Sequence, residues 1–190
     1  MRHGFQDAYY LLGGAVDYVT HAEPDGRRVF FDNGQAVRAK GYMTDLLADR
    51  AMAWMRNRQA RKPWLLYLPF TAPHNPFQAP GDGPVDEANW NKGSRESYAK
   101  MVEHMDRRIG DILAQAATMP GASNTIVIFL SDNGGPARAR NAPLRGFKSS
   151  LFEGGIQGME VAACPAERCS RHCHGNGPGA SRRHCTTDLR

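Results

Sequence analysis

The sequence predicts an α/β fold in which a mixed, largely parallel sheet is flanked by helices. Residues 125–130 contain only Thr, Ile, Val, Phe and Leu, a composition typical of a strand buried in a parallel sheet. A second apolar segment, residues 64–69, lies upstream, and a helical pattern separates the two. The order strand, helix, strand with a long connection is typical of a right-handed parallel crossover.

The first forty residues are mixed and rich in turns, with one recognisable hairpin. Residues 29–31 and 35–37 flank the sequence Asp32-Asn33-Gly34, and Asn-Gly is a strong signal for a hairpin turn. From residue 43 the pattern becomes helical, because apolar side chains recur on one face. That face consists of Met43, Leu46, Leu47, Ala51, Trp54 and Met55.

A long loop and a second helix follow. Residues 70–91 carry repeated Pro, Gly and Asn, and loops of this length are usually functional or disordered. The second helix is expected to start at Ser94 as its N-cap and to run to about Ala117, because an apolar stripe continues along it. The crossover would bring the loops after Phe70 and after Ser131 to the same edge of the sheet.

Composition bounds the class of protein. The chain has 190 residues, of which 41% are hydrophobic and 23% charged, as in an ordinary soluble domain. The net charge of +5 would favour binding of an anionic substrate, or it would serve only to keep the protein soluble. No nucleic acid is expected as a partner, since no basic helix or aromatic-basic surface is visible. No membrane span and no signal peptide are expected either, and the cellular location stays open.

Two oxygen-bearing side chains follow the predicted strand at residues 125–130. Asp132 and Asn133 lie just past its carboxyl end, where open α/β sheets place their ligand sites. A carboxylate and a carboxamide supply hard oxygens that suit Ca²⁺ or Mg²⁺. Gly134 and Gly135 would allow the backbone to approach a ligand closely. The alternative is an Asp-Asn-Gly-Gly turn that binds nothing.

Three segments, in this order, resemble the sulfatase family, particularly its arylsulfatase-like members. They read PWLLYLPFTAPHNPFQAP at 63–80, TIVIFLSDNGG at 125–135 and NAPLRGFKSSLFEGG at 141–155. Residues 41–50 and the helix at 98–110 are similar to the family too. The resemblance implies an alkaline-phosphatase-like α/β fold, truncated at both ends, with residues 1–157 forming part of the catalytic domain of a sulfuric ester hydrolase.

The resemblance also implies roles for single residues. Asp132 and Asn133 match the downstream half of a site for a divalent cation, usually calcium. His74, held between prolines, matches a residue that binds the sulfate ester substrate, and Lys148 matches a lysine that contacts a sulfate oxygen. Both are expected to be catalytic. Without the resemblance, His74 would be an ordinary loop histidine and Lys148 a surface lysine. The family usually has glycine where Phe147 stands.

Other polar residues are weaker candidates. His104 and Asp106 lie within the second predicted helix, where a cap, an ion pair or a solvated face is expected. Glu153 is expected to make hydrogen bonds within a loop. His21 is a candidate for lining a substrate pocket.

The nucleophile of the family is missing from the chain. Sulfatases carry Cys-x-Pro-x-Arg, or serine in place of the cysteine, and that residue is oxidised to formylglycine. The sequence from Cys164 to Arg168 has its proline one residue early and stands after the Glu-Gly-Gly segment, so it is not that motif. The chain is therefore expected to be inactive alone. With half of its ligands absent, the site is also expected to bind calcium weakly.

Residues 158–190 depart from the family pattern and are expected to form an irregular tail, either disordered or translated from a shifted reading frame. Two alternatives for this tail are a disulfide framework and a zinc site built on Cys169, Cys173 and Cys185 with a nearby histidine. Two alternatives for the function also stay open. One is a phosphoryl or phosphonate ester hydrolase of the same superfamily, and the other is a non-enzymatic binding module with a zinc-binding tail.

Overall fold

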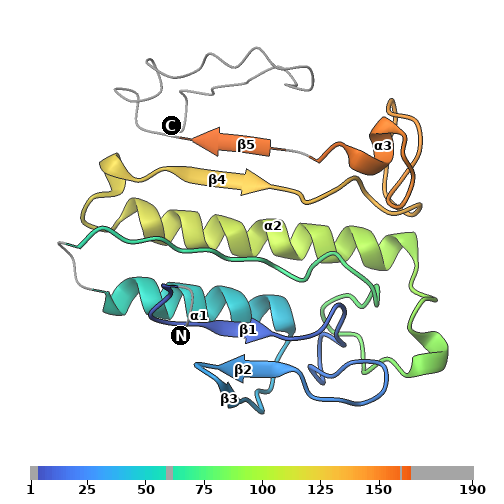
Figure 1. Ribbon diagram of the computed structural model, residues 1–190, viewed down its shortest axis with the longest axis horizontal. Helices are drawn as coiled ribbons and strands as arrows, with labels where there is room; N and C mark the ends of the chain where they lie inside the picture. Colours follow the sequence, from blue (N-terminus) through green and yellow to red (C-terminus); the bar gives the residue numbers. More distant parts are fainter. Residues whose placement is uncertain (1–3, 59–61, 159, 164–190) are drawn as a thin grey trace. The chain divides into compact units, whose positions relative to one another are not determined.

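The computed structural model describes residues 4–58, 62–158 and 160–163 (Figure 1). The chain divides into two compact units, Met1–Thr118 and Met119–Arg190. Each unit has its own helices and strands and is described by itself.

The first unit contains a small antiparallel sheet with the order β1-β2-β3. Its strands are β1 (Tyr9–Leu11), β2 (Phe30–Asp32) and β3 (Gln35–Ala36). The predicted hairpin is confirmed, because β2 and β3 pair around Asn33 and Gly34, whose φ angles are 49° and 87°. Two positive φ angles are what a type I′ turn requires. Strand β1 was not predicted, because only three of its residues pair and the surrounding segment is rich in turns.

Both predicted helices are confirmed. Helix α1 spans Met43–Asn57 and helix α2 spans Arg95–Ala117. The Ser97 amide donates a hydrogen bond of 3.0 Å to the Ser94 hydroxyl, so Ser94 is the N-cap that the sequence indicates. The two helices pack against each other within the first unit (Figure 1). None of the helices described combines the length and apolar character that crossing a membrane requires.

The hydrophobic core of the first unit joins the β-meander, the segment after β1 and the two helices. Met43 of α1 and Met101 of α2 are both fully buried. Burying a side chain of this kind stabilises a fold by roughly 1.5–3 kcal/mol. The other buried members are Val16, Tyr18, Val29, Phe30, Tyr42, Leu47 and Ala72.

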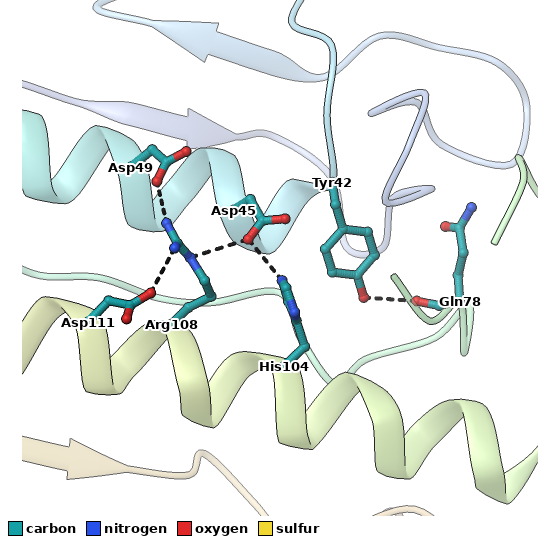
Figure 2. Close-up of polar contacts among 7 residues, drawn as sticks. All are labelled: Tyr42, Asp45, Asp49, Gln78, His104, Arg108 and Asp111. Carbon is teal, nitrogen blue, oxygen red and sulfur yellow. Dashed lines mark hydrogen bonds and ion pairs between the residues drawn. The ribbon is translucent and has the colours of Figure 1, made fainter. Parts of the chain in front are cut away.

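A network of charged side chains joins α1 to α2 beside this core (Figure 2). The Nε2 atom of His104 lies 2.8 Å from Oδ1 of Asp45. The Arg108 guanidinium pairs with three carboxylates: its Nε lies 3.2 Å from Asp45, its Nη1 lies 2.8 Å from Asp111, and its Nη2 contacts Asp49. His104 therefore has a structural role, as a hydrogen-bond partner of Asp45 that links the two helices.

Residues 64–69, predicted as a strand, are extended but pair with no strand in the part of the chain that is described. Residues 65–69 form one wall of a groove of about 450 Å³. The segment from Phe5 through Tyr10 forms the opposite wall, and α1 forms the floor. Leu65 and Tyr67 are 73% and 70% exposed. The prediction of a strand here is wrong because no neighbouring backbone completes the ladder that defines one.

The second unit contains β4 (Val127–Leu130), α3 (Glu153–Ile156) and β5 (Glu160–Ala163). The strands β4 and β5 pair antiparallel. The prediction of helices with sheets is confirmed, whereas the predicted parallel arrangement is not seen, since both sheets within the described residues are antiparallel. Burial on both faces of β4 is also wrong, because Ile128 and Leu130 are 60% and 61% exposed. The alternate residues Val127 and Phe129 are only half-buried, and alternation of this kind is the pattern of a sheet with one open face.

The predicted tail begins with ordered backbone. Residues 160–163 fall within it and form β5. Residues 164–190, which hold all four cysteines, lie outside the described part of the chain, as do the zinc and disulfide alternatives. The boundary at residue 157 between a catalytic domain and a tail stays a prediction.

Replacing Arg108 by alanine is expected to lower the free energy of unfolding by about 1–3 kcal/mol, because three carboxylates lose a partly buried cationic partner. The matched control is Arg107→Ala on the same helix, where the side chain is 63% exposed and, among the described residues, pairs only with Glu103. That change is expected to cost about 0.5 kcal/mol or less. Urea unfolding checks both values, and equal losses would show that the network does not join the helices.

Candidate functional site

The two predicted metal ligands stand directly after β4. Asp132 is exposed and Asn133 is half-buried. The Ser131 hydroxyl donates a hydrogen bond of 2.9 Å to the Asn133 carbonyl. This bond closes a tight turn at the end of the strand. The Asp-Asn couple is thus held at a strand terminus, as the sequence predicts.

Asn141 holds the backbone that follows this turn. Its Oδ1 accepts a hydrogen bond of 3.0 Å from the Gly135 amide, and its Nδ2 donates to the carbonyls of Gly135 at 3.1 Å and Pro136 at 3.3 Å. The Lys148 amide donates to the same Gly135 carbonyl at 2.8 Å. The loop at 136–147 is therefore closed at its base, and the Lys148 backbone is bonded to Gly135, which lies three residues after Asp132 in the chain.

Glycines allow a third segment to join these two. The Gly134 amide donates to the Gly155 carbonyl at 3.1 Å, and the Gly154 amide donates to the Arg145 carbonyl at 2.8 Å. A Cβ atom on Gly134 would collide with the Gly154 carbonyl, and one on Gly154 would collide with the carbonyls of Gly146 and Arg145. The backbone at 132–135, at 145–150 and at 154–155 therefore packs in a way that only glycine permits.

Three polar side chains of this cluster are left without a protein partner. Among the described residues, no hydrogen bond or ion pair reaches the Asp132 carboxylate, the Asn133 carboxamide or the Lys148 ammonium. The Asn141 carboxamide, in contrast, uses both of its ends. A fixed backbone that presents uncommitted oxygens and an ammonium is able to take up a cation and an anion together.

The oxygen donors fit calcium in kind but supply only part of a site. Asp132 and Asn133 offer hard oxygens, whereas Ca²⁺ takes 6–8 of them. In the part of the chain that is described, no group of three or more His, Cys, Asp or Glu side chains is arranged to hold a metal ion. The remaining ligands would have to come from elsewhere.

His74 lies in the long loop of the first unit, after a turn closed by the bond of 2.9 Å from its amide to the Thr71 carbonyl. Its Nδ1 lies 3.0 Å from the Asn75 carbonyl oxygen. Because a carbonyl only accepts, Nδ1 carries a proton and Nε2 is the nitrogen left for a ligand. In the neutral ring Nε2 accepts a hydrogen bond, and in the cation it donates one. Contact with a sulfate oxygen therefore requires the charged ring.

The structure thus brings together Asp132, Asn133 and Lys148 at the backbone level within the second unit. His74 belongs to the first unit. Its convergence with the other three around one pocket stays a prediction.

The weaker candidates have structural positions. His21 is only 4% exposed, and its Nε2 donates to the Gly41 carbonyl at 2.9 Å. His21 therefore stabilises the fold, and its Nε2 is not available to contact a substrate. Asp106 is exposed on α2. Glu153 begins α3, and its carbonyl accepts a hydrogen bond of 2.8 Å from the Gln157 amide.

Two functional features were missed at the sequence level. Asn141 was one residue of a matched segment, and nothing in its neighbours indicates that its side chain closes a loop. Asp17 and Gln78 form a buried polar pair with a bond of 3.2 Å. The signal for Asp17 was a single acid between Val16 and Tyr18-Val19, because an acid in an apolar run is buried only when it is satisfied.

Hard oxygen donors and an ammonium on neighbouring backbone segments are the kinds of group that hydrolases of anionic esters use. The profile of the family described as Sulfatase matches residues 1–158. The chain is 30% identical over 173 residues to Arylsulfatase J of Mus musculus and 35% identical over 132 residues to the uncharacterized sulfatase YdeN of Escherichia coli K12. The chain belongs to the sulfatase family. Members of this family act on sulfate esters and generally use a divalent metal and formylglycine.

Solved structures agree with this assignment. The crystal structure of Ps i-CgsB in complex with k-i-k-neocarrahexaose has a TM-score of 0.70 and 30% identity, over 86% of this chain and 40% of that one. The match to Arylsulfatase J covers 86% of this chain and 29% of the relative, and the match to YdeN covers 66% and 23%. The chain therefore spans less than a third of the length of either relative.

Replacing Gly134 by alanine is expected to separate the strand end from the Gly154 turn, because the added methyl meets backbone that cannot give way. Overpacking of this kind costs about 1–3 kcal/mol. Amide hydrogen exchange at Lys148 and Gly155 should then become faster. The control is Gly110→Ala in α2, where a methyl meets no atom within 4 Å. It is expected to stabilise the helix by about 0.5–1 kcal/mol and to leave exchange at Lys148 unchanged.

Acid is expected to weaken the fold through His21, whose pKa burial lowers from the ordinary value of 6.5. The unfolded chain therefore binds a proton at a higher pH than the folded chain does. Stability is complete above pH 6.5 and is lost as the pH falls from there toward the lowered pKa. His21→Asn, which suits the φ of 59°, should flatten this pH dependence. Urea unfolding between pH 8 and pH 5 measures it, and an unchanged slope would contradict this assignment.

Proposed function

We propose that this chain is part of the catalytic domain of an arylsulfatase-type enzyme that hydrolyses sulfate esters. The observation that carries the proposal is the trio of uncommitted side chains, Asp132, Asn133 and Lys148, on a backbone that glycines and Asn141 hold rigid. The names of the sulfatase relatives support the same chemistry. The net charge of the whole chain, +5, favours an anionic substrate.

Asp132 and Asn133 would supply half of the protein ligands of a calcium ion. A divalent cation at this position supplies charge neutralisation of the sulfate group when it is bound. The Lys148 ammonium would bind a second sulfate oxygen, where it stabilises negative charge that grows as the ester bond breaks.

His74 would act at the ester oxygen that leaves. Because Asn75 holds the proton on Nδ1, the charged ring carries its transferable proton on Nε2. The sulfuryl group would pass to the nucleophile that a longer polypeptide supplies, and as its bond to the ester oxygen breaks, the Nε2 proton would pass to that oxygen, so the alcohol or phenol leaves neutral. The ring then remains neutral with its Nδ1 proton in place.

The chain alone would be inactive. It has no Cys-x-Pro-x-Arg or Ser-x-Pro-x-Arg sequence, so it supplies no formylglycine nucleophile. Its share of the relatives' length, 29% of Arylsulfatase J, leaves room for that residue and for the other calcium ligands in a longer polypeptide. Two ligands alone should give a weak calcium site.

Hydrolysis of a chromogenic aryl sulfate tests the proposal. A complete polypeptide recovered from the same locus is expected to turn over the ester, and the 190-residue chain is expected to show none. In the complete enzyme, Asp132→Asn is expected to lower kcat/KM by at least about 100-fold, because a charged ligand and the orientation it gives are lost.

The matched control is Asp106→Asn, which removes the same charge from an exposed position on α2. It should leave kcat/KM within about twofold, as expected for an exposed side chain away from the reaction. Turnover by the short chain would overturn the account of the nucleophile. Equal effects of the two aspartate substitutions would remove Asp132 from the metal site.

A further inference from the structure

We propose that Tyr18, supported by Asp17 and Gln78, is a positioning residue that fixes the imidazole of His74. This inference rests on the proposed function of His74 as the residue that contacts the sulfate ester. It assigns no contact with substrate to Tyr18 itself. The argument begins with the atoms that hold the His74 loop.

Tyr18 contacts His74 directly through the backbone. Its hydroxyl donates a hydrogen bond of 3.0 Å to the His74 carbonyl oxygen. The Tyr18 side chain is 1% exposed, and its ring stacks on Tyr42 with centroids 5.2 Å apart. A buried, stacked ring has little freedom, so its hydroxyl is a fixed point to which the peptide after His74 is tied.

The Asp17 carboxylate fixes the segment that carries Tyr18. It is 2% exposed. Its Oδ1 accepts from the amides of Val19 at 2.8 Å and Thr20 at 2.6 Å, and its Oδ2 accepts from the Val85 amide at 2.7 Å. Val85 lies beyond the far end of the His74 turn. A buried carboxylate with three amide donors therefore joins the Tyr18 segment to the long loop.

Gln78 makes the second connection between the same two segments. Its Oε1 accepts from the Tyr18 amide at 2.7 Å, and its Nε2 donates to Asp17 at 3.2 Å and to the Gly83 carbonyl at 2.7 Å. The Gln78 side chain is 1% exposed and has each of these donors and acceptors satisfied. The loop is therefore tied down at His74 itself, through Tyr18, and again four residues later, through Gln78.

The consequence for His74 concerns which nitrogen faces a ligand. Its Nδ1 proton is held by the carbonyl of Asn75, the next residue in the chain. That geometry depends on the orientation of the His74–Asn75 peptide, and the carbonyl of this peptide accepts the Tyr18 hydroxyl. Tyr18 thereby keeps the ring in the form with the proton on Nδ1 and leaves Nε2 for the ester.

The test is the ¹⁵N spectrum of the His74 imidazole in the full 190-residue chain. At a pH where the ring is neutral, the native chain should show one tautomer with the proton on Nδ1. Tyr18→Phe keeps the stacked ring and removes only the hydroxyl, so the spectrum should move toward a mixture of both tautomers. Should that variant not fold, Gln78→Met removes the second connection and is expected to shift the spectrum in the same direction.

The matched control is Tyr42→Phe. Tyr42 is also buried, stacks on Tyr18, and donates one hydrogen bond of 2.8 Å, to the Gln78 carbonyl (Figure 2). The two tyrosine variants should lower the urea midpoint by similar amounts, whereas only Tyr18→Phe should change the His74 tautomer. An unchanged spectrum in Tyr18→Phe, or equal changes in both variants, would overturn the proposal.

Titration with inorganic sulfate separates this inference from the proposed function. At a pH where the ring is charged, sulfate is expected to shift the Nε2 resonance of His74 in the native chain. If sulfate shifts nothing, the sulfate-binding role of His74 fails, while the tautomer comparison still decides whether Tyr18 orients the ring.

Discussion

A buried carboxylate organises the first unit of this chain. Asp17 is 2% exposed and is satisfied by amide donors alone. Its donors come from its own turn and from the loop more than sixty residues later, so the two segments must be in place together. A charge in such a position would be costly if any donor moved away. This requirement gives one conformation to a loop whose Pro and Gly content would otherwise permit many.

The second unit reaches a comparable rigidity by another route. Its loops are held by backbone contacts that glycine permits at positions 134, 154 and 155 and by the Asn141 carboxamide. Consequently, the side chains of Asp132, Asn133 and Lys148 make no hydrogen bond or ion pair with the described residues. In this chain the groups that hold the loops are therefore different from the groups proposed to contact metal and ester.

Local signals in the sequence predicted most of the elements. The Asn33-Gly34 turn, the Ser94 cap and the apolar stripes of both helices are short-range features, and each was confirmed. The pairing of the strands, in contrast, depends on which strands lie beside each other, and the hydrophobic pattern of a single segment does not indicate this. An apolar run such as residues 125–130 is compatible with a parallel or an antiparallel sheet. Whether other elements bury its two faces cannot be deduced from its own residues. Buried polar pairs such as Asp17 and Gln78 escape notice because their partners are distant in sequence.

The groove between the Phe5–Tyr10 segment and residues 65–69 has a practical consequence for handling the isolated chain. Within the described residues, strand β1 is paired on only one side, and the opposite wall carries the exposed side chains of Leu65 and Tyr67. Free backbone groups beside apolar side chains are a template on which another extended polypeptide can add. Concentrated solutions of this chain should therefore be prone to edge-to-edge aggregation, and a charged substitution in that wall is the natural remedy.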